Sequence, residues 1–216
     1  MARTPSGTLT SVATAFATSR AVSAISNAAE AVCTSAAHGL VVGDIVEIQS
    51  GWARLHKRAF RVKTVPDANS FVLELADTSN TNLFPAGGGA GSVRKVNTWV
   101  QLSSTMKFSS SGGDPKKVNY KFQESDIEYS LNDGFTPVDR TFEMDADSIG
   151  SPGYVALKQL TDVQTDTIIR RVAKSGAVSL LPCTLSLNEE EIEQDGQIVT
   201  VRVAVSGNNR TTRYAS

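Results

Sequence analysis

The sequence has only two histidines and two cysteines among its 216 residues, so it offers few ligands or nucleophiles for a chemical centre. A zinc site takes about four His or Cys ligands at short spacings, and Cys33 with His38 supplies two at most. His56 lies apart from them, inside a run of basic residues. We therefore interpret both histidines as structural and predict no metal and no cofactor.

Motifs that bind phosphate or activate a serine are also missing. The glycine-rich stretch at residues 87–91 has no following Lys-Ser or Lys-Thr pair and opens no predicted helix, which excludes a phosphate loop and a dinucleotide fingerprint. No nucleophile elbow is present. A Ser/His/Asp triad assembled by the fold stays open, because serine and aspartate are abundant. Nothing favours it, and we expect no enzyme.

The chain also lacks a charge excess and a long apolar run. Its net charge is −1, which gives no sign of a nucleic acid or a membrane as partner. Residues 9–29 are rich in Ala, Ser and Thr and contain Arg20, so they are too polar to span a bilayer. The first residues form no apolar signal segment, and Cys33 and Cys183 lie far apart. We expect a soluble protein made in the cytoplasm, with both thiols free and buried.

What the sequence does contain is a β pattern, in which Val and Thr alternate with polar residues between Gly, Asn, Asp and Pro turns. The predicted strands cover residues 10–16, 21–26, 31–35, 44–50, 58–65, 70–75, 93–107, 117–131, 137–145, 167–174, 177–187 and 197–205. One helix is predicted, with Ser151 as its cap, Pro152 in its first turn, and Tyr154, Leu157 and Leu160 along one face.

The spacing of these strands predicts two units. Short, evenly spaced strands in residues 31–95 indicate a small half-open barrel module with a glycine-rich loop, inserted into a larger β core formed by residues 1–30 and 96–216. Charge is also uneven. Residues 1–98 carry nine Lys/Arg and six Asp/Glu, net +3, whereas residues 99–216 carry twelve and sixteen, net −4.

Acidic residues recur at every second position in three places. An extended chain would put each trio on one strand face, where like charges repel. The trios are Glu124, Asp126 and Glu128; Glu143, Asp145 and Asp147; and Glu189, Glu191 and Glu193. They are either unrelated solvated faces or the wall of a channel past which a polyanion moves without binding, since an acidic wall repels phosphate. Paired carboxylates of a glycosidase are a third reading, which the two tryptophans, Trp52 and Trp99, support poorly.

The basic run at residues 54–63 contains Arg54, Lys57, Arg58, Arg61 and Lys63. A nucleic-acid patch is one interpretation. A solvated strand face, or a surface that meets an acidic neighbour, is the better one.

The order of several short features resembles the tail tube proteins of siphophages, the phages with long non-contractile tails. The features run from residues 21–28, through His38-Gly39-Leu40, Gly43-Asp44-Ile45-Val46, Ser50-Gly51-Trp52 with Leu55, and Arg61-Val62, to residues 85–95, 110–113 and Arg213-Tyr214-Ala215. Together they cover nearly the whole chain. Residues 38–75 also resemble a small β-module of phage tail and fibre proteins, except for His56-Lys57 after the leucine.

The resemblance implies two packed antiparallel sheets flanked by one helix, with the small module inserted. Six subunits would form a ring whose strands close around a lumen, and stacked rings would form a tube in the virion tail. The tube would hold a tape measure protein, contact tail-end proteins and let DNA pass during ejection. The three acidic trios are then candidate lumen residues. Candidate inter-ring or inter-subunit residues are Arg54, Lys57, Arg58, Gly87, Gly88, Gly89, Arg210 and Arg213.

We further expect the polar segments 1–6 and 207–216, or the loops 77–91 and 132–136, to become ordered on assembly. The alternative function is a β-sandwich module that binds carbohydrate or decorates a capsid, with an exposed aromatic patch. A hydrolase ranks third.

Overall fold

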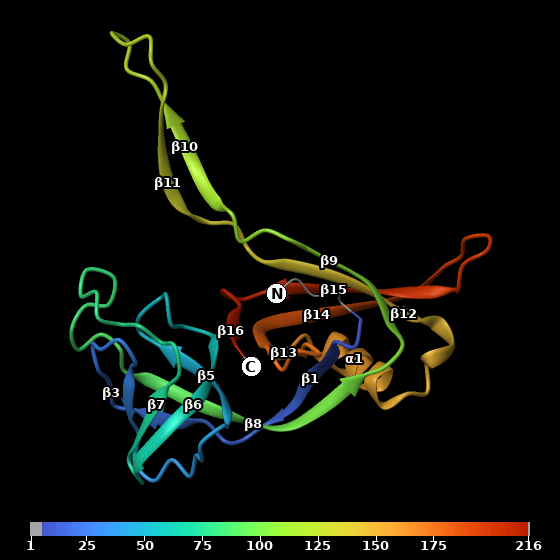
Figure 1. The fold of residues 1–216 in the computed structure, drawn as a ribbon, viewed down its shortest axis with the longest axis horizontal. Helices are drawn as coiled ribbons and strands as arrows, with labels where there is room; N and C mark the ends of the chain where they lie inside the picture. The colour runs from blue at the N-terminus through green and yellow to red at the C-terminus, as the bar shows by residue number, and fades with distance from the viewer. Residues whose placement is uncertain (1–5, 216) are drawn as a thin grey trace.

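The computed structural model describes residues 6–215, which form sixteen strands, a short 3-10 helix and one α-helix (Figure 1). The strands are β1 (Leu9–Phe16), β2 (Arg20–Val22), β3 (Ala24–Ile25), β4 (Val32–Thr34), β5 (Ile45–Ser50), β6 (Arg58–Asp67), β7 (Ser70–Leu73), β8 (Gly91–Leu102), β9 (Thr105–Ser111), β10 (Pro115–Tyr120), β11 (Tyr129–Phe135), β12 (Asp139–Asp145), β13 (Thr167–Val172), β14 (Val178–Ile192), β15 (Thr200–Gly207) and β16 (Thr212–Tyr214). The helices are η1 (Ala146–Ser148) and α1 (Pro152–Val163). The prediction of a mainly β chain with one helix is confirmed.

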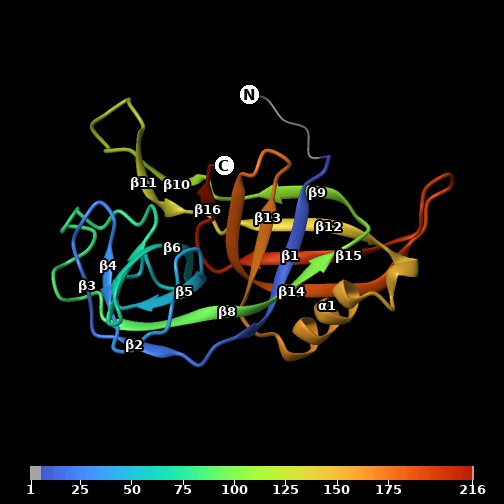
Figure 2. The same cartoon turned by 60° about the horizontal axis from the view of Figure 1, so that its bottom comes forward.

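The prediction of two packed sheets is wrong, because fourteen strands form one continuous antiparallel sheet that curls on itself (Figure 2). Its order is β3-β4-β7-β6-β5-β8-β1-β13-β14-β15-β12-β9, with β2 added to β8 and β16 to β14. Strand β8 joins the two parts, since residues 91–95 pair with β5 and residues 96–102 pair with β1. A twelve-residue strand that serves both parts leaves no break between them.

Three hydrophobic clusters fill the structure. The first lies inside the small module and includes Trp52, Phe60 and Phe71, together with Val22 from β2. The second lies between α1 and the inner face of β12, β14 and β15, and the third, around Ile168 and Leu180, lies between the module and β13–β14. Cys33 and Cys183 are both buried and free, as the sequence predicted.

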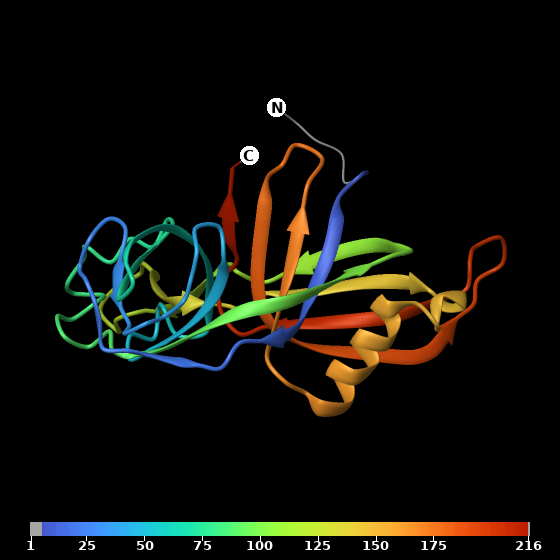
Figure 3. The ribbon, with the colours of Figure 1, turned by 90° about the horizontal axis from the view of Figure 1, so that it is seen from below.

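The helix forms where the sequence predicted it. The Tyr154 N–H donates to Ser151 Oγ over 3.2 Å, which caps the first turn, and Pro152 occupies a position that needs no N–H donor. Leu157 is fully buried and packs into the second cluster. Thr161 connects the helix to the sheet, because its hydroxyl accepts from the Leu187 N–H over 2.8 Å. Figure 3 shows α1 along one face of the sheet.

Two strand predictions were wrong because each ran across a break. The strand predicted over residues 93–107 is broken at Ser104, whose φ of 53° is in the left-handed region, so β8 ends and β9 begins there. The strand predicted over residues 117–131 is a hairpin, β10–β11, with a loop at residues 121–128. The polar segment 207–216 contains β16, and its Tyr214 side chain is buried. Residues 1–6 were expected to become ordered on assembly, and residues 1–5 of this segment lie outside the described part of the chain.

Candidate assembly surfaces

The β10–β11 hairpin projects away from the rest of the molecule (Figure 1). Within the described residues its two strands pair only with each other, and no residue of β11 is buried. Its exposed apolar side chains include Val118, Phe122, Ile127 and Leu131, between 46% and 63% exposed. An isolated two-stranded hairpin is marginally stable in water, and apolar side chains grouped on a projection mark an interaction site.

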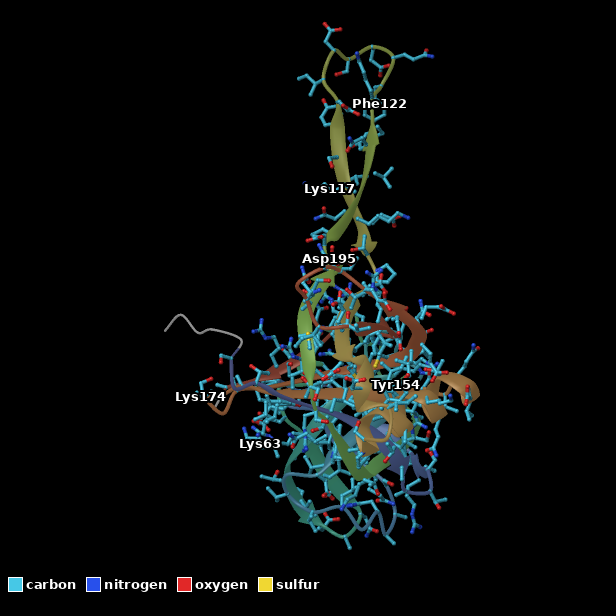
Figure 4. All side chains as sticks on the ribbon, turned by 90° about the vertical axis from the view of Figure 1, so that its right-hand side faces the viewer. Lys63, Lys117, Phe122, Tyr154, Lys174 and Asp195 are labelled. Atoms are coloured by element: carbon cyan, nitrogen blue, oxygen red, sulfur yellow. The ribbon has the colours of Figure 1, made fainter. Side chains whose placement is uncertain are left out.

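Aromatic rings group near the end of this hairpin. Tyr120 stacks on Tyr129 with 5.5 Å between ring centroids, and Phe122 contacts both rings edge-on at 5.4 and 6.1 Å. Figure 4 shows Phe122 close to the tip, well beyond Lys117. Sequence reasoning missed this cluster because it read residues 117–131 as one strand. Ser125 and Asp126, both common in turns, were the signal that could have located the loop.

The first acidic trio lies in this loop and not on a strand, which corrects the sequence interpretation. Glu124, Asp126 and Glu128 are all exposed, and none makes a side-chain hydrogen bond or ion pair with another described residue. The loop is held instead by its backbone, with the Ser125 N–H donating to the Phe122 carbonyl over 3.1 Å.

The second trio is divided between a strand and the 3-10 helix. Glu143 and Asp145 lie on β12, on the face opposite Phe142 and Met144, while Asp147 lies in η1. Glu143 forms an ion pair with Lys107 at 2.9 Å. This contact, with further support from Thr200, holds the pKa of the Glu143 carboxyl below its ordinary value.

That face of β9, β12, β15 and β14 is mostly polar. Cross-strand partners share a face, so Asp139 lies beside Ser206, Glu143 beside Arg202 and Asp145 beside Thr200. Further positions on the same face hold Thr184, Ser186 and Ala204. Strand β9 ends the sheet and pairs only with β12 among the described residues, so its outer edge has no strand beside it. This open edge and the short polar side chains form what we call the polar face.

Glu189, the first residue of the third trio, is on the other side of the same sheet. Glu189 follows the parity of the buried Leu185 and Leu187 and meets the helix, where Lys158 Nζ contacts its carboxylate at 2.9 Å and the Tyr154 hydroxyl donates to it over 3.2 Å. Lys158 holds the pKa of Glu189 below its ordinary value. Glu191 is still in β14, whereas Glu193 lies beyond its end. The structure therefore does not bring the three trios onto one surface.

The basic run is mostly paired within the chain. Lys57 contacts Asp166 at 2.6 Å, Arg61 contacts Glu74 at 2.5 Å and Lys63 contacts Glu30 at 2.6 Å. These pairs leave Arg54 and Arg58 without a carboxylate among residues 6–215. A continuous nucleic-acid patch does not form here, because its cations already neutralise neighbouring carboxylates.

Arg54 and Arg58 line a groove of about 750 Å³ between the module and the base of the hairpin. Arg210 lies on its other wall, with the guanidinium carbon 3.5 Å from the centroid of the Phe135 ring. Phe84 and Pro137 add apolar surface. Arg213 is exposed on β16. Burial lowers the pKa of the Arg140 guanidinium below its ordinary value, and the charges of Arg171 and Arg213 lower it further.

The residues considered for chemistry have structural contacts. His38 Nε2 lies 3.3 and 3.2 Å from the carbonyl oxygens of Asp67 and Ser70, and the Leu40 N–H donates to Nδ1 over 3.0 Å. No group of three or more His, Cys, Asp or Glu side chains within residues 6–215 is arranged to hold a metal ion. Neither helix in that range is long and apolar enough to cross a membrane.

Comparison with known families decides between the readings. Residues 50–216 match the family model described as phage tail tube protein, TTP. The chain belongs to the phage tail tube protein family. A search of curated proteins finds no match. The protein is therefore a structural, non-enzymatic subunit of the virion tail, and its family implies self-assembly into a tube.

The glycine-rich loop of this tail tube subunit is held by contacts within its own module. The Trp52 Nε1–H donates to the Pro85 carbonyl over 2.8 Å, and a Cβ added at Gly89 would lie 2.8 Å from the indole ring. Asn27 Nδ2 donates to the carbonyls of Thr78 and Phe84. The loop therefore needs no neighbouring subunit to be held in place. Trp52 is buried and forms no exposed aromatic patch.

Proposed function

We propose that this tail tube subunit assembles into hexameric rings that stack into the non-contractile tube of a siphophage tail. The tube holds a tape measure protein before ejection and then conducts DNA. Family membership supports the tube, and the earlier resemblance supports the number six and the siphophage tail. The observation that carries the proposal is the hairpin, a projecting element whose strands pair only with each other among the described residues and whose apolar side chains stay exposed in the subunit.

Two unsatisfied features have separate roles in this assembly. The open edge of β9 pairs with a strand of the neighbouring subunit in the ring, since an unpaired edge is a template for another strand. The charge of Lys107 and the irregular pairing of β9 near Glu143 disfavour pairing of this edge with an arbitrary strand. The edge therefore pairs selectively with the strand of the neighbouring subunit. The hairpin contacts the next ring. Such head-to-tail contacts do not close and therefore produce a filament.

The polar face is the wall of the lumen in this proposal. It carries short hydroxyl side chains and three carboxylates, Asp139, Glu143 and Asp145, against two cations, Lys107 and Arg202. A face of this kind gives passing phosphates no excess of cations to bind. Helix α1 and Glu189 lie on the opposite side of the sheet, toward the outside of the tube.

Electron microscopy of the concentrated protein tests the proposal. The full chain is expected to form rings or tubes with a central channel, whereas a variant with residues 115–135 replaced by a short Gly/Ser turn remains unstacked. The urea midpoint of that variant should stay close to that of the full chain, because among the described residues β10 and β11 pair only with each other. Its circular dichroism should show the loss of these two strands and no further loss. Compact particles at every concentration would contradict the proposal and favour a binding or decoration module.

The lumen assignment has its own test. The exposed polar-face variants Asp139→Lys and Ser186→Lys add positive charge where DNA passes and should reduce DNA delivery from assembled tails while tubes still form. Asp162→Lys on the exposed side of α1 is the matched control, expected to leave delivery unchanged. Equal DNA delivery by all three variants would show that the polar face does not line the lumen.

A further inference from the structure

The groove at the base of the hairpin has cations that its own subunit does not neutralise. Arg54 and Arg210 are exposed, Arg58 is partly buried, and none of the three forms an ion pair with a described carboxylate. The remaining charged side chain in the groove wall, Asp77, accepts hydrogen bonds from the Ser79 N–H and hydroxyl.

Arg58 shows that these charges are held near one another. Burial lowers the pKa of the Arg58 guanidinium below its ordinary value, and the charge of Arg210 lowers it further. Its Nε is buried without a hydrogen-bond partner among the described residues, while its Nη2 donates to Thr212 Oγ1 over 3.3 Å. An acidic group brought into the groove would relieve this repulsion.

The tip of the hairpin has the complementary composition. Its three carboxylates, Glu124, Asp126 and Glu128, lack partners, and Phe122 and Ile127 beside them are 53% and 63% exposed. The groove combines unpaired guanidinium groups with apolar surface from Phe84, Phe135 and Pro137. The carboxylates and the apolar side chains of the tip therefore each have a chemical counterpart in the groove, whereas Lys121 is the one exposed cation of the 121–128 loop.

We propose that the hairpin tip of one subunit binds in the arginine groove of a second copy of the chain. The inference rests on the proposed tube function and names the site that receives the hairpin. The hairpin projects away from the rest of the molecule (Figure 1), and Phe135 and Pro137 at its base line the groove, so the tip and the groove of one molecule do not meet. Because the groove lies at the base of the hairpin, every copy offers a tip at the outer end of its hairpin and a groove at the inner end. The contact between one copy and the next can therefore repeat in one direction.

The β14–β15 turn is the other acidic projection, and it fits the groove less well. Glu189, in β14 at the base of this projection, is already bound by Lys158 and Tyr154. The turn has no aromatic side chain to cover Phe84 and Phe135. It serves as the competing occupant in the tests.

Disulfide trapping tests the contact directly. The double variant Ala53→Cys with Gln123→Cys places one thiol in the groove wall and one in the tip, and the native Cys33 and Cys183 are buried. Oxidation of the assembled protein should produce a ladder of covalent multimers. Lys174→Cys with Gln123→Cys, and Ala53→Cys with Gln194→Cys in the β14–β15 turn, are matched controls that should give no ladder.

Charge reversal provides a second, non-covalent test. Arg54→Glu with Arg210→Glu, and separately Glu124→Lys with Asp126→Lys and Glu128→Lys, should each raise the concentration needed for tube formation about tenfold or more. The combined five-site variant should restore assembly, because the reversed tip fits the reversed groove. The urea midpoint of each variant identifies any loss of folding.

The outcomes separate the two proposals. If tubes form, but only the Gln194 pair gives a ladder or the reversals have no effect, the groove assignment is wrong and the tube function stands. If the unaltered chain forms no regular assembly at any concentration, both are wrong.

Discussion

Among single residues, Tyr214 links the C-terminal segment to the inserted module through Arg61. Its ring is buried, and the Arg61 N–H donates to its hydroxyl over 2.7 Å, while the Arg61 guanidinium lies over the ring at 4.6 Å. The polar segment that the sequence suggested would be mobile is therefore anchored by one aromatic side chain.

Replacing this tyrosine should weaken the fold measurably. Tyr214→Phe leaves the partly buried Arg61 N–H without its acceptor, so we expect a loss of about 1 kcal/mol in the free energy of unfolding, measured by urea denaturation. Tyr120→Phe is the control, because no hydrogen bond to another described residue involves that hydroxyl. Equal midpoints for Tyr214→Phe and the unaltered chain would show that the contact contributes nothing.

Buried acids with high pKa values make the fold sensitive to alkali. Burial raises the pKa of the Cys33 and Cys183 thiols from 9.0 to about 12, and that of the Tyr214 hydroxyl from 10.0 to about 12. Above pH 9 the unfolded chain loses these protons while the folded chain keeps them, so stability falls as pH rises from about 9 to 12.

The urea midpoint in reducing buffer should therefore be lower at pH 11 than at pH 8. Tyr214→Phe should reduce the size of this decrease, since one of the three groups is removed. A midpoint that does not change between these pH values would contradict the burial of the three groups.

At the scale of secondary-structure elements, glycine sets the direction of the hairpin. Gly112 has a φ of 76°, and a Cβ added there would lie 1.7 Å from the carbonyl oxygen of Pro137. The chain can leave β9 and enter β10 in this direction only without a side chain at that position.

Gly112→Ala should therefore shift the hairpin relative to the sheet and abolish tube formation, with a smaller effect on the second hydrophobic cluster. The measurement is electron microscopy together with the thermal unfolding temperature. Gly150→Ala is the control, because a Cβ there meets no other atom within 4 Å and its φ is not positive. Normal tubes from Gly112→Ala would contradict a fixed hairpin direction.

The sequence predicted elements where local chemistry marks their ends and failed where it does not. Ser151 and Pro152 located the helix because capping is a local interaction. The break at Ser104 carries no glycine or proline, and the alternating acids of residues 124–128 imitate a strand, so both were missed. The joining of the module strands to the core strands in one sheet depends on the pairing of β8 with β5 and β1, which is a long-range property.

The candidate surfaces divide in the same way. The acidic tip and the basic residues were visible as composition, and Arg54, Arg58 and Arg210 were already candidates. Their convergence on one groove depends on where residues 54–58 and 208–210 meet in space. The distribution of the three acidic trios over different surfaces likewise follows from the turn at residues 121–128 and from strand parity.

For the whole molecule, the subunit alone leaves an open sheet edge, an exposed hairpin and an unneutralised groove. Assembly should therefore stabilise the folded chain by mass action, because neighbouring subunits bind the folded chain and not the unfolded one. The unfolding temperature is expected to rise with protein concentration across the range where tubes form, in scanning calorimetry at a fixed scan rate. The variant without residues 115–135 should show no such increase, and a concentration-independent value for the full chain would contradict coupling between folding and stacking.

The most direct measurement is a cryo-electron microscopy reconstruction of the tube formed by the unaltered chain. We expect a hexameric ring with the polar face of β9, β12, β15 and β14 lining the channel, α1 on the outside, and each hairpin tip against Arg54 and Arg210 of a subunit in the next ring. A reconstruction with α1 in the channel, or with the hairpin tips free in solvent, would contradict it.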